Sequence, residues 1–125
     1  MNKNTKNYKE LISNKKMTSE GILFREHLLS ILGEEGAEVI QAISKANRFG
    51  IHTTESNNKD EPNNSEKIVQ ECYDFIAVLE MLIEIEALPK LNESDIETWK
   101  QNKKERRLCL LIKIVGERKE DYFKL

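Results

Sequence analysis

Five acidic residues fall into two groups whose spacing suits metal chemistry. Glu34, Glu35 and Glu38 lie within little more than one helical turn, and Glu71 and Asp74 stand three positions apart. Side chains three or four positions apart share one face of a helix, so each group can present a pair of carboxylates. If two neighbouring helices carry these pairs, four like charges converge and repel one another. Either raised pKa values leave some of the acids neutral, or divalent cations offset the charge.

The side-chain types indicate which cation would fit. Carboxylate oxygens without histidine or thiolate are the ligand set of a hard cation, and Mg²⁺ fits best, with Mn²⁺ as the alternative. Such an ion keeps several waters and often completes its shell with phosphate oxygens. It would offset charge on a phosphoryl group and lower the pKa of a bound water. Glu34 or Glu38 could then accept the proton of that water as general base.

The first acidic group lies in a segment with helical periodicity. Apolar residues recur at intervals of three and four from about Ser19 to Phe49, which predicts an amphipathic helix. Thr18 or Ser19 could cap its start, and Gly50 suits the left-handed residue after its end. We expect residues 1–17 to be a flexible or short docking segment before the helical domain.

The second acidic group lies in the next periodic segment. Residues 51–66 are polar and predict a loop. A helix should follow from about Ser65, its N-cap, to Leu88, because Pro89 disfavours helix at the residue before it. The middle of this segment, CYDFIAVLEMLIEI, is apolar on most sides and predicts the buried helix of the fold.

A third helix is predicted from about Glu93 to Gly116. Its expected inward stripe consists of Ile96, Trp99, Leu108, Leu111, Ile112 and Val115. Strand-like alternation is almost absent from the chain. The fold class is therefore all-α: a bundle of three long helices in one domain over residues 18–125. Its broad apolar faces predict completion by self-association.

Composition narrows the class of protein. Charged residues make up 34% of the 125 residues, with 22 acidic against 20 basic and a formal net charge of −2. A general nucleic-acid binder usually has a clear basic excess, so we expect no nucleic-acid polymer as partner. No apolar run approaches the roughly 20 residues that span a bilayer, so we expect no membrane. Cys72 and Cys109, in apolar surroundings, favour reduced thiols in a cytoplasmic protein.

The two motifs together resemble a known family. EEGAE followed by ECYD is similar to the EExxE…ExxD signature of the MazG-like all-α nucleoside triphosphate pyrophosphohydrolases. The resemblance covers roughly residues 22–107, and the polar segment makes the interval between the motifs longer than is usual for the family. It implies hydrolysis of a (d)NTP between the α and β phosphates to a (d)NMP and pyrophosphate. It also implies a house-cleaning role in the nucleotide pool and a homodimer or homotetramer.

The resemblance also implies roles for individual residues. Glu35 and Glu38 would be metal ligands from the first helix, and Glu71 and Asp74 from the second. Glu34 matches the leading acid of the motif and would orient water or act from outside the metal's ligand shell.

A nucleoside triphosphate substrate needs cationic side chains in addition to the metal. Lys45 and Arg48 follow the first acidic group, and Lys67 precedes the second by one turn. MazG-like proteins use basic residues of a later helix to hold phosphates, which implies that role for Lys100, Lys103 and Lys104. Each of these basic residues could instead be a solvated surface group. Aromatic residues that could stack on a base, or else belong to the core, are Phe24, Tyr73, Phe75 and Trp99.

Three other interpretations compete with the enzyme. The acids could be the solvated face of a structural bundle, although Asp74 stands between Tyr73 and Phe75 in the least polar segment. A non-catalytic regulatory protein could keep the helices without the chemistry. A ferritin-like di-iron site needs Glu-x-x-His pairs, which neither His27 nor His52 supplies.

Overall fold

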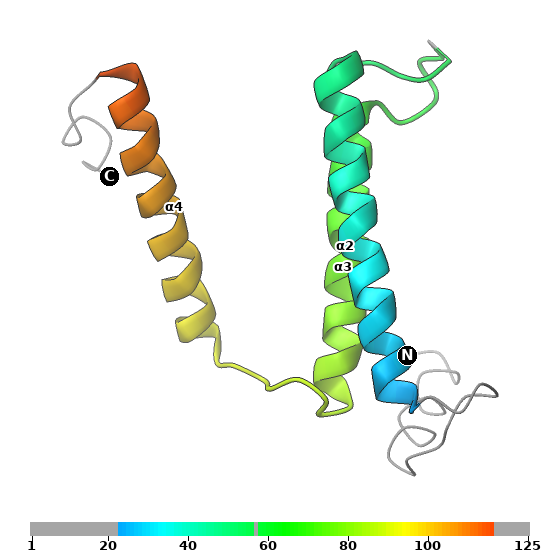
Figure 1. Cartoon of the computed structure of the whole chain (residues 1–125), viewed down its shortest axis with the longest axis vertical. Helices are drawn as coiled ribbons and strands as arrows, with labels where there is room; N and C mark the ends of the chain where they lie inside the picture. The colour runs from blue at the N-terminus through cyan, green and yellow to red at the C-terminus, as the bar shows by residue number, and fades with distance from the viewer. Residues whose placement is uncertain (1–22, 57, 117–125) are drawn as a thin grey trace. The chain divides into compact units, whose positions relative to one another are not determined.

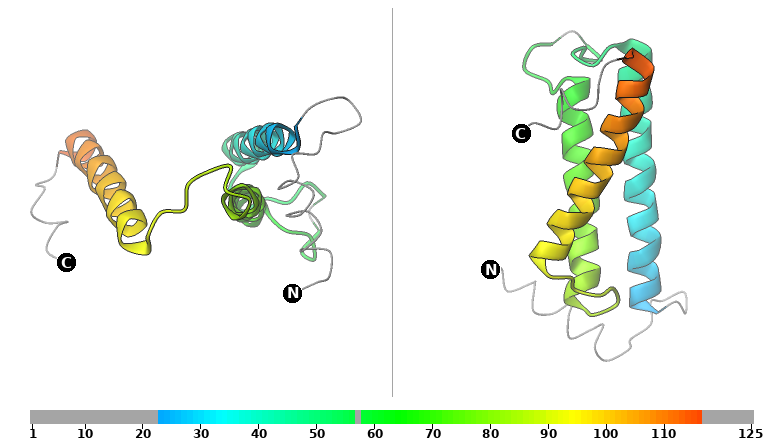
Figure 2. Two further views of the ribbon diagram at one scale, coloured as in Figure 1. Left: turned by 90° about the horizontal axis from the view of Figure 1, so that it is seen from below. Right: turned by 90° about the vertical axis from the view of Figure 1, so that its left-hand side faces the viewer.

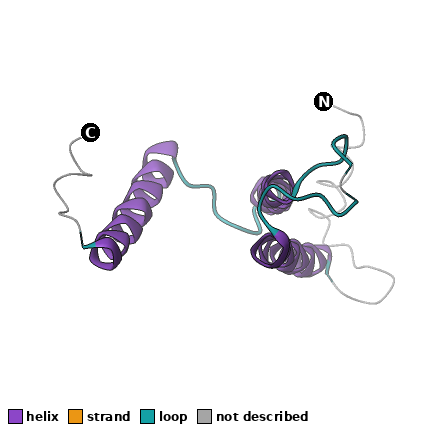
Figure 3. Ribbon diagram, turned by 90° about the horizontal axis from the view of Figure 1, so that it is seen from above, coloured by secondary structure: helices purple, strands orange, loops and turns teal. Residues whose placement is uncertain are grey.

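The structure is a computed structural model that describes residues 23–56 and 58–116. Within these residues the protein is all-α, with helices α2 (Phe24–Phe49), α3 (Asn64–Glu84) and α4 (Glu93–Val115) and no strand (Figures 1 and 3). The chain divides between Pro89 and Lys90 into two compact units, one holding α2 and α3 and the other holding α4. The single domain predicted over residues 18–125 stays a prediction, and the segment 1–17 lies outside the described residues.

Helices α2 and α3 form an antiparallel pair that positions the acidic residues. They lie side by side along their length, with the loop between them at one end (Figures 1 and 2). Leu28 and Ala46 of α2 and Leu82 of α3 are buried, and Leu82 is 1% exposed. The Phe75 ring lies against Gly36, where an added Cβ would stand 3.6 Å from its Cε2 atom. A Cβ at this position would make only an ordinary van der Waals contact with the ring, so the packing of Phe75 on α2 does not require glycine.

The ends of α2 differ in part from the prediction. The helix begins at Phe24 after Leu23, whose side chain makes no capping hydrogen bond; the predicted start at Ser19 lies outside the described residues. At the other end, Gly50 has φ +104° and donates its N–H to the Ala46 carbonyl at 2.9 Å. The helix ends at Phe49 as predicted, and Gly50, with ψ 140°, has a positive-φ conformation that glycine adopts readily but not the predicted left-handed helical one.

The ends of α3 correct the sequence prediction. Asn63, not Ser65, is the N-cap, because its side chain accepts a hydrogen bond from the Glu66 N–H at 2.9 Å. The helix ends at Glu84, four residues before the predicted Leu88. The chain then turns through Glu86, whose φ is +62°. The Leu82 carbonyl accepts hydrogen bonds from the N–H groups of Ala87 and Leu88, at 3.0 and 3.2 Å.

Helix α4 begins and ends as predicted. Asn92 caps its start by accepting the Asp95 N–H at 2.8 Å, and Gly116 after its end is left-handed, with φ 75° and ψ 20°. The predicted inward stripe stays a prediction. Ile112 is buried, whereas Trp99, Leu111 and Val115 are 62%, 55% and 60% exposed.

Within the unit formed by α2 and α3, only one side of α3 is covered by α2, and burial of its other sides stays a prediction. Val69, Tyr73 and Ile76 of α3 are 54%, 65% and 39% exposed. Within the described part of this unit, α2 covers one face of α3 and leaves these three residues on another. Leu29, Ile40 and Ile43 of α2 are likewise exposed. None of the three described helices combines the length and apolar character that crossing a membrane requires.

Candidate metal centre

The antiparallel pair brings three of the predicted ligands together. Glu35 of α2 and Glu71 and Asp74 of α3 each offer one carboxylate oxygen, and these oxygens all lie within 4.8 Å of one another. Glu71 and Asp74 are three positions apart and so share a face of α3. That face is turned toward α2, because Phe75, four positions after Glu71, packs on Gly36 of α2. The helical spacing and the close packing at Gly36 together produce the cluster.

Two oxygens of the cluster are buried without a hydrogen-bond partner. Oε2 of Glu35 and Oε2 of Glu71 accept no hydrogen bond from the described residues. Buried polar atoms nearly always have a partner, because an unpaired one loses its hydration without compensation. A bound cation would supply the missing partner to both oxygens at once.

The electrostatics of the cluster favour the same conclusion. Burial among apolar groups raises the pKa of the Glu35 carboxyl, and the negative charges of Glu38 and Asp74 raise it further. The pKa of Glu71 is raised first by burial, then by the neighbouring carboxyl group of Glu38 and the charges of Asp74 and Glu35. Without a cation, the cluster therefore resists full ionisation. A divalent ion would reverse this preference, because it favours the charged carboxylates.

The dimensions and donor types suit a small hard cation. Magnesium binds oxygen ligands at about 2.1 Å in an octahedron, so neighbouring ligands stand about 3.0 Å apart and opposite ones about 4.2 Å apart. Oxygens within 4.8 Å of one another need only small side-chain movements to reach that geometry. All three donors are carboxylates, which selects against the metals that prefer nitrogen or sulfur. Remaining positions would hold waters or phosphate oxygens.

The other two predicted acids lie beside this group. Glu38 is exposed, and it is close enough to raise the pKa of both Glu35 and Glu71. It is not one of the three whose oxygens converge, so its role as ligand or general base stays a prediction. Glu34 is also exposed, and its charge contributes the smallest of the effects on Glu35. Its predicted role in orienting water stays a prediction as well.

The predicted phosphate-binding residues of the first unit already have partners. Lys45 Nζ lies 3.2 Å from Glu55 Oε1, and Lys67 Nζ lies 3.8 Å from the same oxygen. The Arg48 guanidinium stands 5.1 Å from the centre of the Phe49 ring. Glu55 was not among the residues expected from the sequence. Nothing in the pattern around it signals the pairing, which arises from the path of the loop.

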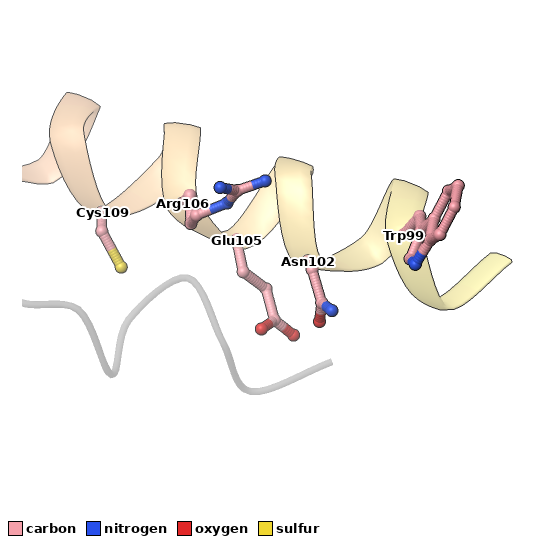
Figure 4. A pocket seen from close by; sticks show the side chains of 5 residues that line it. All are labelled: Trp99, Asn102, Glu105, Arg106 and Cys109. Atoms are coloured by element: carbon pink, nitrogen blue, oxygen red, sulfur yellow. The ribbon is translucent and has the colours of Figure 1, made fainter. Parts of the chain in front are cut away.

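The three lysines expected to hold phosphates lie on α4, in the second unit. Lys100, Lys103 and Lys104 are exposed, and Lys100 pairs with Glu97 at 3.3 Å. A hollow runs along one face of the same helix (Figure 4), and none of these lysines lines it. The side chains that line it are Trp99, Asn102, Glu105, Arg106 and Cys109. The phosphate-binding role of the lysines stays a prediction.

Of the aromatic residues considered for stacking on a base, Phe75 packs against Gly36, while Tyr73 and Trp99 are exposed.

Comparison of the chain with models of protein families, with curated proteins and with solved structures found no match. The similarity to the MazG-like enzymes thus rests on the acidic motifs themselves. What the structure establishes is an all-α protein with a carboxylate cluster suited to a metal ion.

Proposed function

We propose that the protein is a Mg²⁺-dependent nucleoside triphosphate pyrophosphohydrolase that cleaves between the α and β phosphates. The observation that carries the proposal is the convergence of Glu35, Glu71 and Asp74, two of which hold buried, unpartnered oxygens. A solvated acidic face would leave those oxygens in water. The EExxE…ExxD spacing that produces the cluster is the feature that resembles this class of enzyme.

Each residue has a defined task in the proposed reaction. Glu35, Glu71 and Asp74 hold the cation. When bound, that cation offsets charge on the phosphoryl group and acidifies water. Glu38 is exposed beside the cluster, where it can accept a proton from the attacking water as general base. Lys67 lies one turn, about 6 Å, before Glu71 along α3, whereas Lys45 lies about 15 Å from Glu35 along α2.

The test is release of pyrophosphate from a panel of canonical and damaged nucleoside triphosphates with Mg²⁺. We expect one pyrophosphate and one monophosphate per substrate, and no turnover in EDTA. Glu71→Gln should lower kcat by at least about a hundredfold, because it removes a charged ligand that acts throughout the reaction. Parental activity in this variant would contradict the assignment of the site.

A matched control comes from the same helix. Glu80 is exposed on α3, outside the acidic cluster, so Glu80→Gln removes one negative charge without touching the cluster. We expect this variant to keep parental activity. Magnesium binding that depends on Glu71, with no hydrolysis of any triphosphate in the panel, would instead support the non-catalytic helical protein considered above.

The proposed enzyme is a homodimer or homotetramer. The support is the exposed apolar faces of α2 and α3, which carry Leu29, Ile40, Val69 and Tyr73, each at least half exposed. Exposed apolar surface of this kind commonly marks an interface. Light scattering should show a mass of two or four chains, and a stable monomer at micromolar concentration would contradict this part of the proposal.

A further inference from the structure

A second hollow lies at the loop end of the helix pair. It has a volume of about 440 Å³, within the range of small-molecule sites. Lys45 and Phe49 of α2, Thr53, Thr54 and Glu55 of the loop, and Asn64 of α3 line it. Lys45 is ten residues beyond Glu35, about 15 Å along the helix, so this hollow is separate from the acidic cluster.

The charges at this hollow are arranged around one carboxylate. Lys45 comes from α2 and Lys67 from α3, yet both ammonium groups approach the same oxygen of Glu55, at 3.2 and 3.8 Å. Two positive charges thus share one negative charge. The two lysines lower the pKa of the Glu55 carboxyl, chiefly through the hydrogen bond from Lys45. An anion with two or more negative oxygens would match these lysines better than one carboxylate does.

The walls of the hollow are held in place before any ligand arrives. Asn64 is 4% exposed, and its amide group donates to the Gly50 carbonyl at 2.8 Å. The N–H groups of Asn64 and Ser65 donate to the Thr53 and Ile51 carbonyls at 3.0 and 2.7 Å. These bonds fix the first loop residues on the start of α3, with Thr53 and Thr54 lining the hollow.

Glu55 is a lining residue whose side chain can move away at little cost. Its side chain is 62% exposed, whereas those of Lys45 and Lys67 are 44% and 30% exposed. Solvent-exposed ion pairs contribute little to stability, so moving the Glu55 carboxylate away costs little. We propose that this hollow binds the phosphate group of a small molecule, whose oxygens replace the Glu55 carboxylate between Lys45 and Lys67. Thr53 and Thr54 would donate hydrogen bonds to the same group.

The test measures binding of inorganic phosphate by isothermal titration in EDTA, with the full chain. Lys45→Ala and Lys67→Ala should each weaken binding about tenfold or more, because each removes a charge-assisted contact. Glu55→Gln should tighten binding about two- to fivefold, because it removes the competing carboxylate. Arg25→Ala is the matched control, since Arg25 is exposed on α2 about 30 Å along the helix from Lys45. Circular dichroism confirms that each variant is folded.

The outcomes separate the proposal from the hydrolytic function. Equal phosphate affinity in the parent, Lys45→Ala and Glu55→Gln proteins would overturn the site, whatever the protein hydrolyses. A second arm uses a non-hydrolysable nucleoside triphosphate with Mg²⁺. If Lys67→Ala and Glu71→Gln both weaken its binding, the phosphate at this hollow belongs to the substrate. If Lys67→Ala weakens only the binding of inorganic phosphate, the ligand is a separate phosphate-bearing molecule.

Discussion

Replacing Glu71 by glutamine should remove most of the stabilisation of the protein by magnesium. The substitution keeps the shape of the side chain but removes one of the three charges that converge at the cluster. A ligand that binds only the native state stabilises it by RT ln(1 + [L]/Kd). At a magnesium concentration of about ten times Kd, the parent protein therefore gains about 1.4 kcal/mol.

This free energy can be converted into a shift of the unfolding temperature. A chain of 125 residues has an unfolding entropy of about 0.26 kcal/mol/K at about 2.1 cal/mol/K per residue. The expected shift for the parent is then about 5 °C. Loss of a charge-assisted contact weakens binding by about tenfold or more, so Glu71→Gln at the same magnesium concentration should shift by less than about 2 °C.

The assay is thermal unfolding followed by circular dichroism, in EDTA and across a magnesium titration. In EDTA, Glu71→Gln should unfold at the same temperature as the parent or higher, because a neutral amide does not repel Glu35 and Asp74. Glu80→Gln should keep the full magnesium shift. The reasoning is refuted if Glu71→Gln shifts as far as the parent, or if both variants lose the shift equally.

Three further predictions concern pH and packing. The raised pKa values of Glu35 and Glu71 give the metal-free protein a stability that is present below the unfolded value near 4.5 and is lost as pH rises through the folded values. The unfolding temperature of the parent in EDTA, relative to a Glu35→Gln/Glu71→Gln double variant, should therefore fall as pH rises above the unfolded value, and a difference that does not change with pH would contradict the raised pKa values. Leu82→Ala should lower the unfolding free energy measured in urea titrations by about 2–5 kcal/mol, because Leu82 is 1% exposed. A loss below about 1 kcal/mol would show that neighbouring side chains fill the cavity left by Leu82 or that Leu82 is open to solvent. Asn63→Ala should cost about 1 kcal/mol by losing the N-cap of α3, and Ser65→Ala should cost less; the reverse order would restore Ser65 as the cap.

The helices and the acidic cluster were predictable because both follow from helical periodicity. Residues three and four apart share a face, so the pairing of Glu71 with Asp74 and their meeting with Glu35 needed only antiparallel packing. The end of α4 at Gly116 was predictable because glycine after a helix signals the left-handed conformation there.

What the sequence did not reveal depends on the path of the loop and on what covers each face. Asn63 and Ser65 are both good N-caps, and the choice follows from loop residues that bond to the start of α3. The apolar pattern of α3 predicted burial on most sides, but a pattern does not identify the covering partner. Glu55 was missed because its approach to two lysines depends on the course of the loop, which follows no periodicity.

The most direct measurement is a crystal structure grown with Mn²⁺ as an anomalous substitute for Mg²⁺. We expect one anomalous peak bonded to carboxylate oxygens of Glu35, Glu71 and Asp74, with the buried oxygens of the two glutamates engaged. Well-ordered carboxylates that turn away from one another into solvent, with no peak between them at saturating Mn²⁺, would contradict the metal centre and the function proposed from it.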